Sequence, residues 1–247
     1  MPAFLQYILF LGFVSLMFVL RLDAKRFSAA EWDTEDGDWR VWLGRLSWYG
    51  AGLALALIIF ALHPSPVSEL NLVLAPDSNE ALVLGLLFGG AGIIGAFVLA
   101  ILRSGRIRFP PPGRYPGGVL YSVGTAFFDE FLFRGVLLGL LLLLGLPDWL
   151  AVISQAFIYA FTVRAGTGSR GILILGVWLA IGLAGGVLVL MTAGIGAAFV
   201  GHAITRFALF MTMGPPERAA VEQVAPPARG SGEDGAYVIR PRDYRRG

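Results

Sequence analysis

Two stretches of otherwise apolar sequence carry the ionisable side chains best suited to chemistry. The first stretch holds Asp129, Glu130 and Arg134, and the second holds His202 and Arg206. Carboxylates beside a histidine in a dry pocket can activate water for hydrolysis of a peptide bond, with a cationic group on the oxyanion. The same groups can instead neutralise one another, since two arginines balance two carboxylates in charge. Counting charges alone slightly favours neutralisation.

Helical spacing can bring these five groups together. Glu130 and Arg134 are four residues apart, as are His202 and Arg206, so each pair shares one face of a helix. Asp129 lies about 100° around from its neighbour and can face a different helix. Both stretches place their charges at a similar depth from the same end of the bundle. We therefore expect one buried cluster.

The elements that position these groups are membrane helices. The chain has 247 residues, of which 56% are hydrophobic and 15% are charged, whereas a soluble domain carries about 25% charge. Apolar stretches long enough to cross the ~30 Å hydrocarbon core recur along it. They are residues 3–20, 46–62, 81–102, 117–146, 149–165, 171–190 and 193–213. The sequence therefore predicts an all-α, polytopic membrane protein with about seven transmembrane helices.

Residue counts exclude several kinds of site. The absence of cysteine excludes disulfides, thiol catalysis and thiolate metal ligands, and two histidines exclude a three-histidine metal site. We expect no cofactor and no metal. The basic residues are spread over loops, so we expect no nucleic-acid partner. His63, beside Pro64 at the end of an apolar stretch, is expected to lie at the surface.

The basic residues also indicate the orientation. They concentrate in residues 21–26, 103–116 and 164–170 and in the C-terminal tail, whereas residues 63–80 and 146–148 carry no lysine or arginine. Because basic loops face the cytoplasm, the N-terminus is expected outside and the C-terminus in the cytoplasm. No basic residue precedes the first apolar stretch, which indicates a retained helix rather than a cleaved leader. We expect the chain in the cell (plasma) membrane of a bacterium.

Three segments follow from this pattern. Residues 1–116 are expected to form three transmembrane helices with cytoplasmic loops, and residues 117–213 a four-helix membrane core with both ionisable stretches. Residues 214–247 are rich in proline, glycine and charge and are expected to be a mostly disordered cytoplasmic tail. The acidic loop 31–39, with its alternating tryptophans, is expected to be solvated, with an interfacial or partner-binding role as the alternative.

Small residues recur four apart between residues 85 and 96. Gly85 and Gly89 form one such pair, and Gly92 and Ala96 form another. This spacing lets helix backbones approach closely, either within the chain or between two copies of it. Packing within the chain is the favoured interpretation.

The sequence Asp129-Glu130-x-x-x-Arg134 resembles the E-E-x-x-x-R motif of the CAAX protease and bacteriocin-processing family, also called CPBP or Abi, of intramembrane proteases. The resemblance covers about residues 117–212 and implies a CPBP-type helical core. Aspartate replaces the first glutamate, which retracts the carboxylate by about 1.3 Å, close to the length of one bond.

The family's other two motifs are matched by spacing and helix order. F-x-x-x-H would fall at Phe157–Phe161, with Phe161 in place of the histidine, and H-x-x-x-N at His202–Arg206, with Arg206 in place of the asparagine. The resemblance implies that Asp129 and the second motif's histidine would activate water, while His202 and the asparagine would hold the oxyanion. Phe161 can accept no proton, and Arg206 can pair with a carboxylate instead.

Two functions remain in competition. The first is a non-catalytic family member that binds or scaffolds another integral membrane protein, as an accessory subunit among membrane lipids. The second is an active endopeptidase that cuts near the cytoplasmic membrane face, with Asp129 as base and His202 and Arg206 on the oxyanion. A transporter or channel is disfavoured because the sequence shows no convincing internal repeat.

Overall fold

The computed structural model of the protein describes residues 3–22, 27, 39–63, 65–105, 107, 109–167 and 171–213. Within these ranges the regular structure is helical and includes no strand, which confirms the all-α class. The described helices belong to one compact unit, residues 1–215. The predicted solvated loop, apart from Trp39, and the predicted disordered tail lie outside the described residues.

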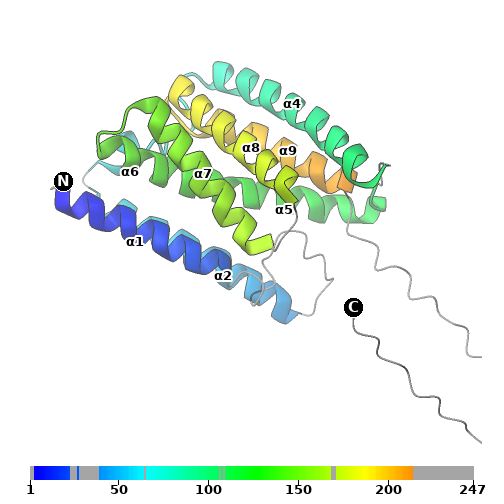
Figure 1. The fold of residues 1–247 in the computed structure, drawn as a ribbon, viewed down its shortest axis with the longest axis horizontal. Coiled ribbons are helices and arrows are strands. Elements are labelled where there is room, and N and C mark those ends of the chain that lie inside the picture. The colour runs from blue at the N-terminus through cyan, green and yellow to red at the C-terminus, as the bar shows by residue number, and fades with distance from the viewer. Residues whose placement is uncertain are drawn as a thin grey trace, which may run out of the picture. The chain divides into compact units, whose positions relative to one another are not determined.

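The helices follow the seven apolar stretches. They are α1 (Ala3–Leu22), α2 (Trp39–Leu62), a short α3 (Pro66–Glu69), α4 (Ser78–Ser104), α5 (Tyr115–Asp129), a π-helical segment (Glu130–Leu137), α6 (Leu138–Leu143), α7 (Asp148–Thr167), α8 (Gly171–Thr192) and α9 (Gly196–Met213). α5, the π-helical segment and α6 follow one another without a break and together form the predicted stretch 117–146 (Figure 1).

Three helical segments are long and apolar enough to cross a membrane: Phe4–Leu22, Ser78–Leu102 and Leu175–Thr192. Leu46–Leu62 and Asp148–Val163 are apolar but shorter. These segments agree with a membrane protein. The crossing of the membrane by all seven stretches, and the orientation of the termini, remain predictions.

Glycines bring α4 and α9 into close contact. A Cβ added at Gly85, Gly89 or Gly92 would lie less than 3.0 Å from an atom of α9. Their closest neighbours on α9 are Ala197, Val200, Ile204 and Thr205. These three glycines therefore serve packing within the chain, as predicted.

We expect Gly92→Ala to destabilise the protein by about 1–3 kcal/mol, as overpacking commonly does. The new Cβ would lie 2.7 Å from the Cβ of Thr205, an atom that the α9 backbone holds in place. Gly95→Ala, on the same helix, is the matched control, because nothing lies within 4 Å of its Cβ. Alanine there should stabilise the helix by up to about 1 kcal/mol. Equal thermal unfolding of the two variants in detergent would contradict this packing.

The start of α9 is held by a segment that precedes α4. Ile195 N donates to Val73 O over 2.8 Å, and Gly196 N donates to Leu74 O over 2.6 Å. Gly196 permits this approach, since a Cβ there would collide with the backbone of Leu74. These bonds set the position of α9 and therefore of the histidine it carries.

The prediction that His63 lies at the surface is wrong. The residue is only 4% exposed, because α3 packs against the end of α2. His63 Nε2 lies 3.3 Å from a carboxylate oxygen of Glu69, and its Nδ1 accepts a hydrogen bond from Ser65 N over 3.2 Å. This histidine is part of the local structure at the end of α2.

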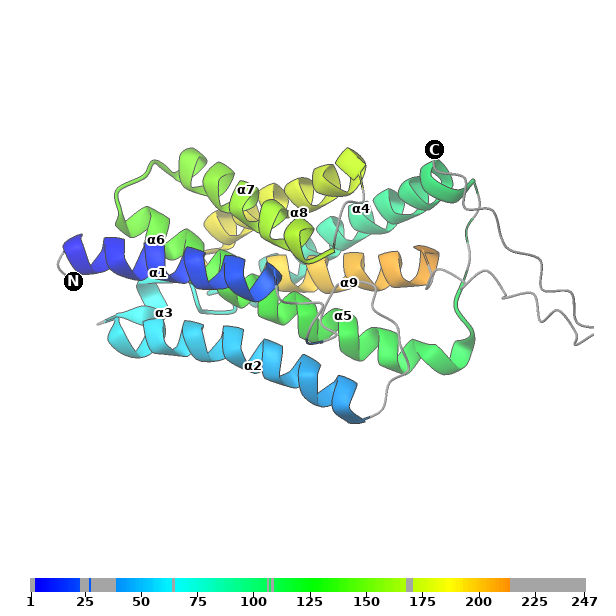
Figure 2. The same cartoon turned by 60° about the horizontal axis from the view of Figure 1, so that its bottom comes forward.

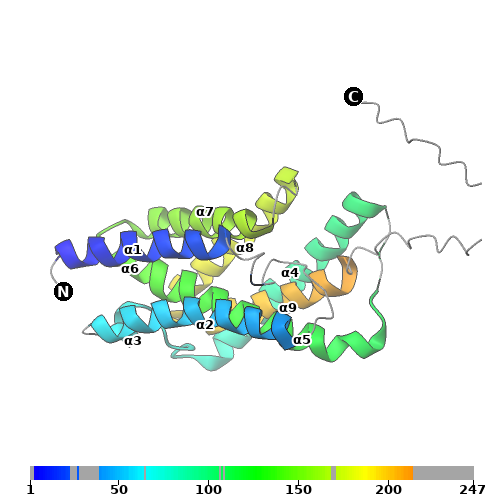
Figure 3. The same cartoon turned by 90° about the horizontal axis from the view of Figure 1, so that it is seen from below.

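α1 lies between α7 and α2 on one side of the bundle, as two further views show (Figures 2 and 3). Its fully buried residues include Phe13 and Met17, four residues apart. The C-terminal end of α1 is fastened to α2 by the indole of Trp48, which donates to Leu20 O over 2.6 Å.

Candidate functional site

The five side chains singled out from the sequence meet in one buried cluster. None is more than 5% exposed. They come from the end of α5, from the π-helical segment that follows it and from α9, which packs beside α5 (Figure 1). The members are Asp129, Glu130, Arg134, His202 and Arg206.

The first motif straddles the junction of α5 and the π-helical segment. π-helical turns are rare in proteins, and those that occur often lie at functional sites. Arg134 Nη1 lies 3.2 Å from Glu130 Oε1, and Arg134 Nη2 donates to the carbonyl oxygen of Ile181 on α8 over 2.9 Å. The guanidinium group also lies 4.3 Å from the centroid of the Tyr159 ring. Arg134 therefore joins the π-helical segment to α7 and α8.

Both carboxylate oxygens of Asp129 accept hydrogen bonds. Arg21 Nη2 donates to Oδ1 over 2.8 Å, and Arg206 Nη2 donates to Oδ2 over 2.5 Å. The hydroxyl of Tyr159 adds a third bond, to Oδ2 over 3.2 Å. With only 1% of the residue exposed, Asp129 is enclosed by two cations and a phenol.

His202 is held in one tautomer by its two neighbours. Arg206 Nε donates to His202 Nε2 over 3.0 Å, and a guanidinium group has donors only, so Nε2 must accept. The proton therefore lies on Nδ1, which donates to Glu130 Oε1 over 2.6 Å. The hydroxyl of Tyr159 lies 3.3 Å from Nε2. The lone pair on His202 Nε2 thus already accepts a hydrogen bond from the guanidinium group of Arg206.

Phe161, which the motif spacing places at the expected histidine position, does not reach the cluster. Phe161 is 46% exposed and stacks on Phe157, with ring centroids 6.2 Å apart. Two residues correspond to about 200° around a helix, so Tyr159 faces the opposite side and reaches the cluster instead. One signal could have found it: Gln155 and Tyr159, four residues apart, are polar side chains in an apolar stretch, and both are fully buried.

Arg21 is the second residue that the sequence analysis missed. It lies in the last turn of α1, where it was used only as an indicator of orientation. In the structure it is 6% exposed, bonds Asp129 and lies 4.9 Å from the ring centroid of Trp48. No signal in the sequence pairs it with a carboxylate 108 residues away.

Arg21 changes the charge balance of the cluster. Three guanidinium groups now face two carboxylates, which leaves one excess positive charge when His202 is neutral. The second oxygen of Glu130, Oε2, is buried and has no hydrogen-bond partner among the described atoms. Asp129, the acid that the family resemblance makes the base, therefore accepts a hydrogen bond from a cation on each oxygen, while Glu130 keeps one oxygen unbonded.

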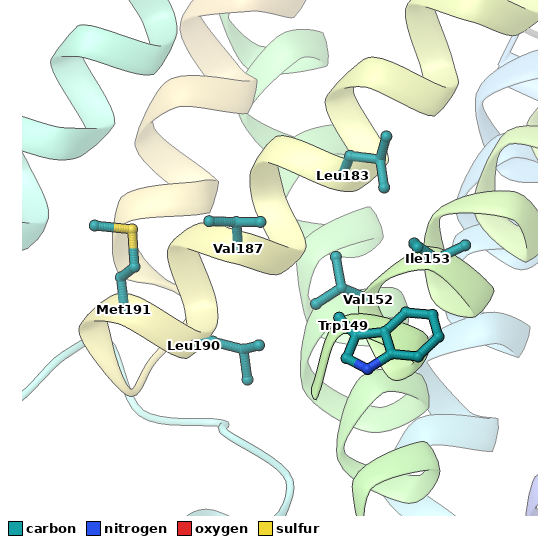
Figure 4. A pocket seen from close by; sticks show the side chains of 7 residues that line it. All are labelled: Trp149, Val152, Ile153, Leu183, Val187, Leu190 and Met191. Atoms are coloured by element: carbon teal, nitrogen blue, oxygen red, sulfur yellow. The ribbon is translucent and has the colours of Figure 1, made fainter. Parts of the chain in front are cut away.

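Two apolar grooves flank α8. The groove between α7 and α8 has a volume of about 460 Å³ (Figure 4), and the one between α4 and α8 about 400 Å³. The first is lined by Trp149, Val152, Ile153, Leu183, Val187, Leu190 and Met191. Neither groove includes a residue of the charged cluster, so neither leads a substrate to it in this conformation.

The comparisons with known proteins agree with the motif. Residues 111–208 match the family model described as type II CAAX prenyl endopeptidase Rce1-like. No curated protein and no solved structure matches the chain. The matched segment contains the five predicted side chains and Tyr159, but not Arg21. Residues 111–208 are therefore similar to the Rce1-like type II CAAX prenyl endopeptidases, which confirms the resemblance to the CAAX protease and bacteriocin-processing family.

Proposed function

We propose that this protein is a non-catalytic family member that binds or scaffolds another integral membrane protein, as an accessory subunit in the bacterial cell membrane. One observation carries the proposal. Arg206 donates to Asp129 Oδ2 and to His202 Nε2, the two acceptors best placed to take a proton from water. A single side chain thus occupies both candidate bases.

Hydrolysis needs a base with a free lone pair within hydrogen-bond reach of the water it activates. Asp129 has a guanidinium group on each oxygen, and breaking such buried pairs is costly. α7, the helix on which the family motif would place a histidine, instead directs Tyr159 to the cluster, where its hydroxyl donates to Asp129. A neutral phenol donates a hydrogen bond to that carboxylate and cannot replace an imidazole as a proton acceptor.

The binding part of the proposal is supported by the helices outside the matched segment. α1 exposes large apolar side chains along most of its length, including Phe4 at 77% and Leu11 at 61%. Such faces meet lipid or another membrane helix, where association depends on close packing rather than on a hydrophobic driving force. α1, α2 and α4 therefore supply surface that the family segment does not need for its own site.

A cleavage assay tests the loss of catalysis. The full chain in proteoliposomes is given a reporter peptide that ends in a prenylated CAAX box, the substrate class in the family's description. We expect no cleavage above the level of the Asp129→Asn variant. Cleavage by the parent protein that Asp129→Asn abolishes in a folded sample would overturn the proposal.

Purification in mild detergent tests the accessory role. We expect an integral membrane protein to co-purify with the tagged chain in a fixed ratio, and to be lost in harsher detergent. A homogeneous sample that contains only this chain and lipid, at native expression level, would contradict a subunit function.

A residual protease is the second candidate, and one observation favours it. Glu130 presents an unbonded Oε2, while its Oε1 bonds His202 Nδ1 over 2.6 Å. A carboxylate that orients an imidazole is a common part of hydrolytic sites. In that case the enzyme would cut near the cytoplasmic membrane face, and Glu130→Gln and His202→Ala would each abolish cleavage of the same reporter.

A further inference from the structure

We propose that α1 is a displaceable latch on the charged cluster. In this structure Arg21 donates a hydrogen bond to Oδ1 of Asp129. A shift of α1 would remove this bond and expose the cluster at the C-terminal end of α1. The inference rests on the proposed function, in which the cluster does not cleave a substrate, and concerns the regulation of that cluster. Both α1 and the residue that fastens it, Trp48, lie outside the family segment.

α1 has few buried residues. They are Phe13, Met17 and Arg21, one every four residues, so they form a single row on one face. Half-buried residues such as Val14 flank this row, whereas the opposite side of the helix is exposed, with Val19 at 54%. A helix with few buried contacts belongs to the part of a protein that opens most readily.

Arg21 is the cation that is easiest to withdraw. It lies one residue before the end of α1, so a small shift of the helix lets its long side chain reach the membrane interface. Its Nε is buried with no hydrogen-bond partner among the described atoms, so the guanidinium group is incompletely bonded where it sits. Arg134 and Arg206 lie within helical segments and cannot leave in this way.

Trp48 aims Arg21 at the cluster. Its indole nitrogen donates to Leu20 O over 2.6 Å, and its ring faces the guanidinium group of Arg21 at 4.9 Å. Its ring centroid also lies 5.5 Å from that of Phe128, the residue before Asp129. Trp48 on α2 therefore contacts both the end of α1 and the residue next to Asp129.

Charge balance is compatible with both positions of the latch. When Arg21 is withdrawn, the cluster keeps two guanidinium groups and two carboxylates. The opened cluster therefore has no net charge. Oδ1 of Asp129 is then a free acceptor for another cation. The chemistry that would replace Arg21 is a lysine or arginine near the end of a partner's membrane helix.

Thiol labelling tests the latch directly, because the chain contains no cysteine. Thr125→Cys places one thiol a turn before Asp129, at a position that is 5% exposed. A water-soluble maleimide should label it slowly in the otherwise unchanged protein. Adding Arg21→Gln should raise the labelling rate at least tenfold, whereas Arg21→Lys, which keeps a cation, should stay close to the parent rate.

Two further variants complete the experiment. Phe13→Ala loosens the seat of α1 without altering a charge and should also speed labelling, while Phe4→Ala, at an exposed position of the same helix, should not. Unchanged labelling in folded Arg21→Gln would overturn the latch. If Arg21→Gln does not fold, unchanged labelling in Phe13→Ala would do so.

The labelling assay involves no cleavage, so the latch and the proposed function can fail separately. A protein that labels as expected but cleaves the prenylated reporter would overturn only the non-catalytic function. A protein whose labelling rate does not change in the variants, and that does not cleave the reporter, would overturn only the latch.

Discussion

Asp129→Ala should destabilise the protein by about 3–5 kcal/mol, the range expected when one partner is removed from a buried ion pair. The substitution leaves Arg21 and Arg206 inside the bundle without the carboxylate that both of them bond. It also raises the imbalance to three cations against the single carboxylate of Glu130. Thermal unfolding in detergent measures the effect.

Two comparisons make this prediction specific. Asp148→Ala removes the same side chain from an exposed position at the start of α7 and should cost less than about 1 kcal/mol. Arg206→Asn removes one guanidinium group but leaves two cations against two carboxylates, so it should cost less than Asp129→Ala. If Asp129→Ala unfolded at the parent temperature, the cluster would not be a structural ion network.

The helices could be predicted because long apolar stretches indicate them directly. Each of the seven apolar stretches corresponds to helical structure within the described residues. The meeting of both ionisable stretches also followed from the sequence, since buried charges need partners and the spacing of four residues places each pair on one face. Few arrangements other than one shared cluster would give all five buried ionisable groups a partner.

The contacts that required tertiary information could not be predicted. The side of α7 that faces the cluster depends on the rotation of that helix, which a uniformly apolar stretch does not reveal. The motif spacing pointed to Phe161, whereas Tyr159 contacts Asp129. Arg21 was missed because nothing local distinguishes a buried arginine from one at the interface. His63 was misplaced because the four residues of α3 pack against the end of α2.

The corrected rotation of α7 changes which variant should restore proteolysis. Tyr159→His together with Arg206→Asn places the family's side chains where the structure brings residues 159 and 206 against Asp129 and His202. General-base catalysis typically contributes about 10²–10⁴-fold, so cleavage of the prenylated reporter should rise by at least about 10²-fold over the parent. Adding Arg21→Gln should raise it further, because Oδ1 of Asp129 then loses its remaining guanidinium partner.

The matched control is Phe161→His with Arg206→Asn. Phe161 lies on the exposed side of α7, with 46% of the residue accessible, so an imidazole there cannot reach Asp129 and no cleavage is expected. Equal activity of the two double variants would show that α7 rotates relative to this structure. A folded Tyr159→His, Arg206→Asn protein that cleaves nothing, even with Arg21→Gln added, would show a different loss. That result would mean that the protein lacks a path for a substrate to the cluster, in addition to the missing side chains. The two apolar grooves agree with this, because neither is lined by a residue of the cluster.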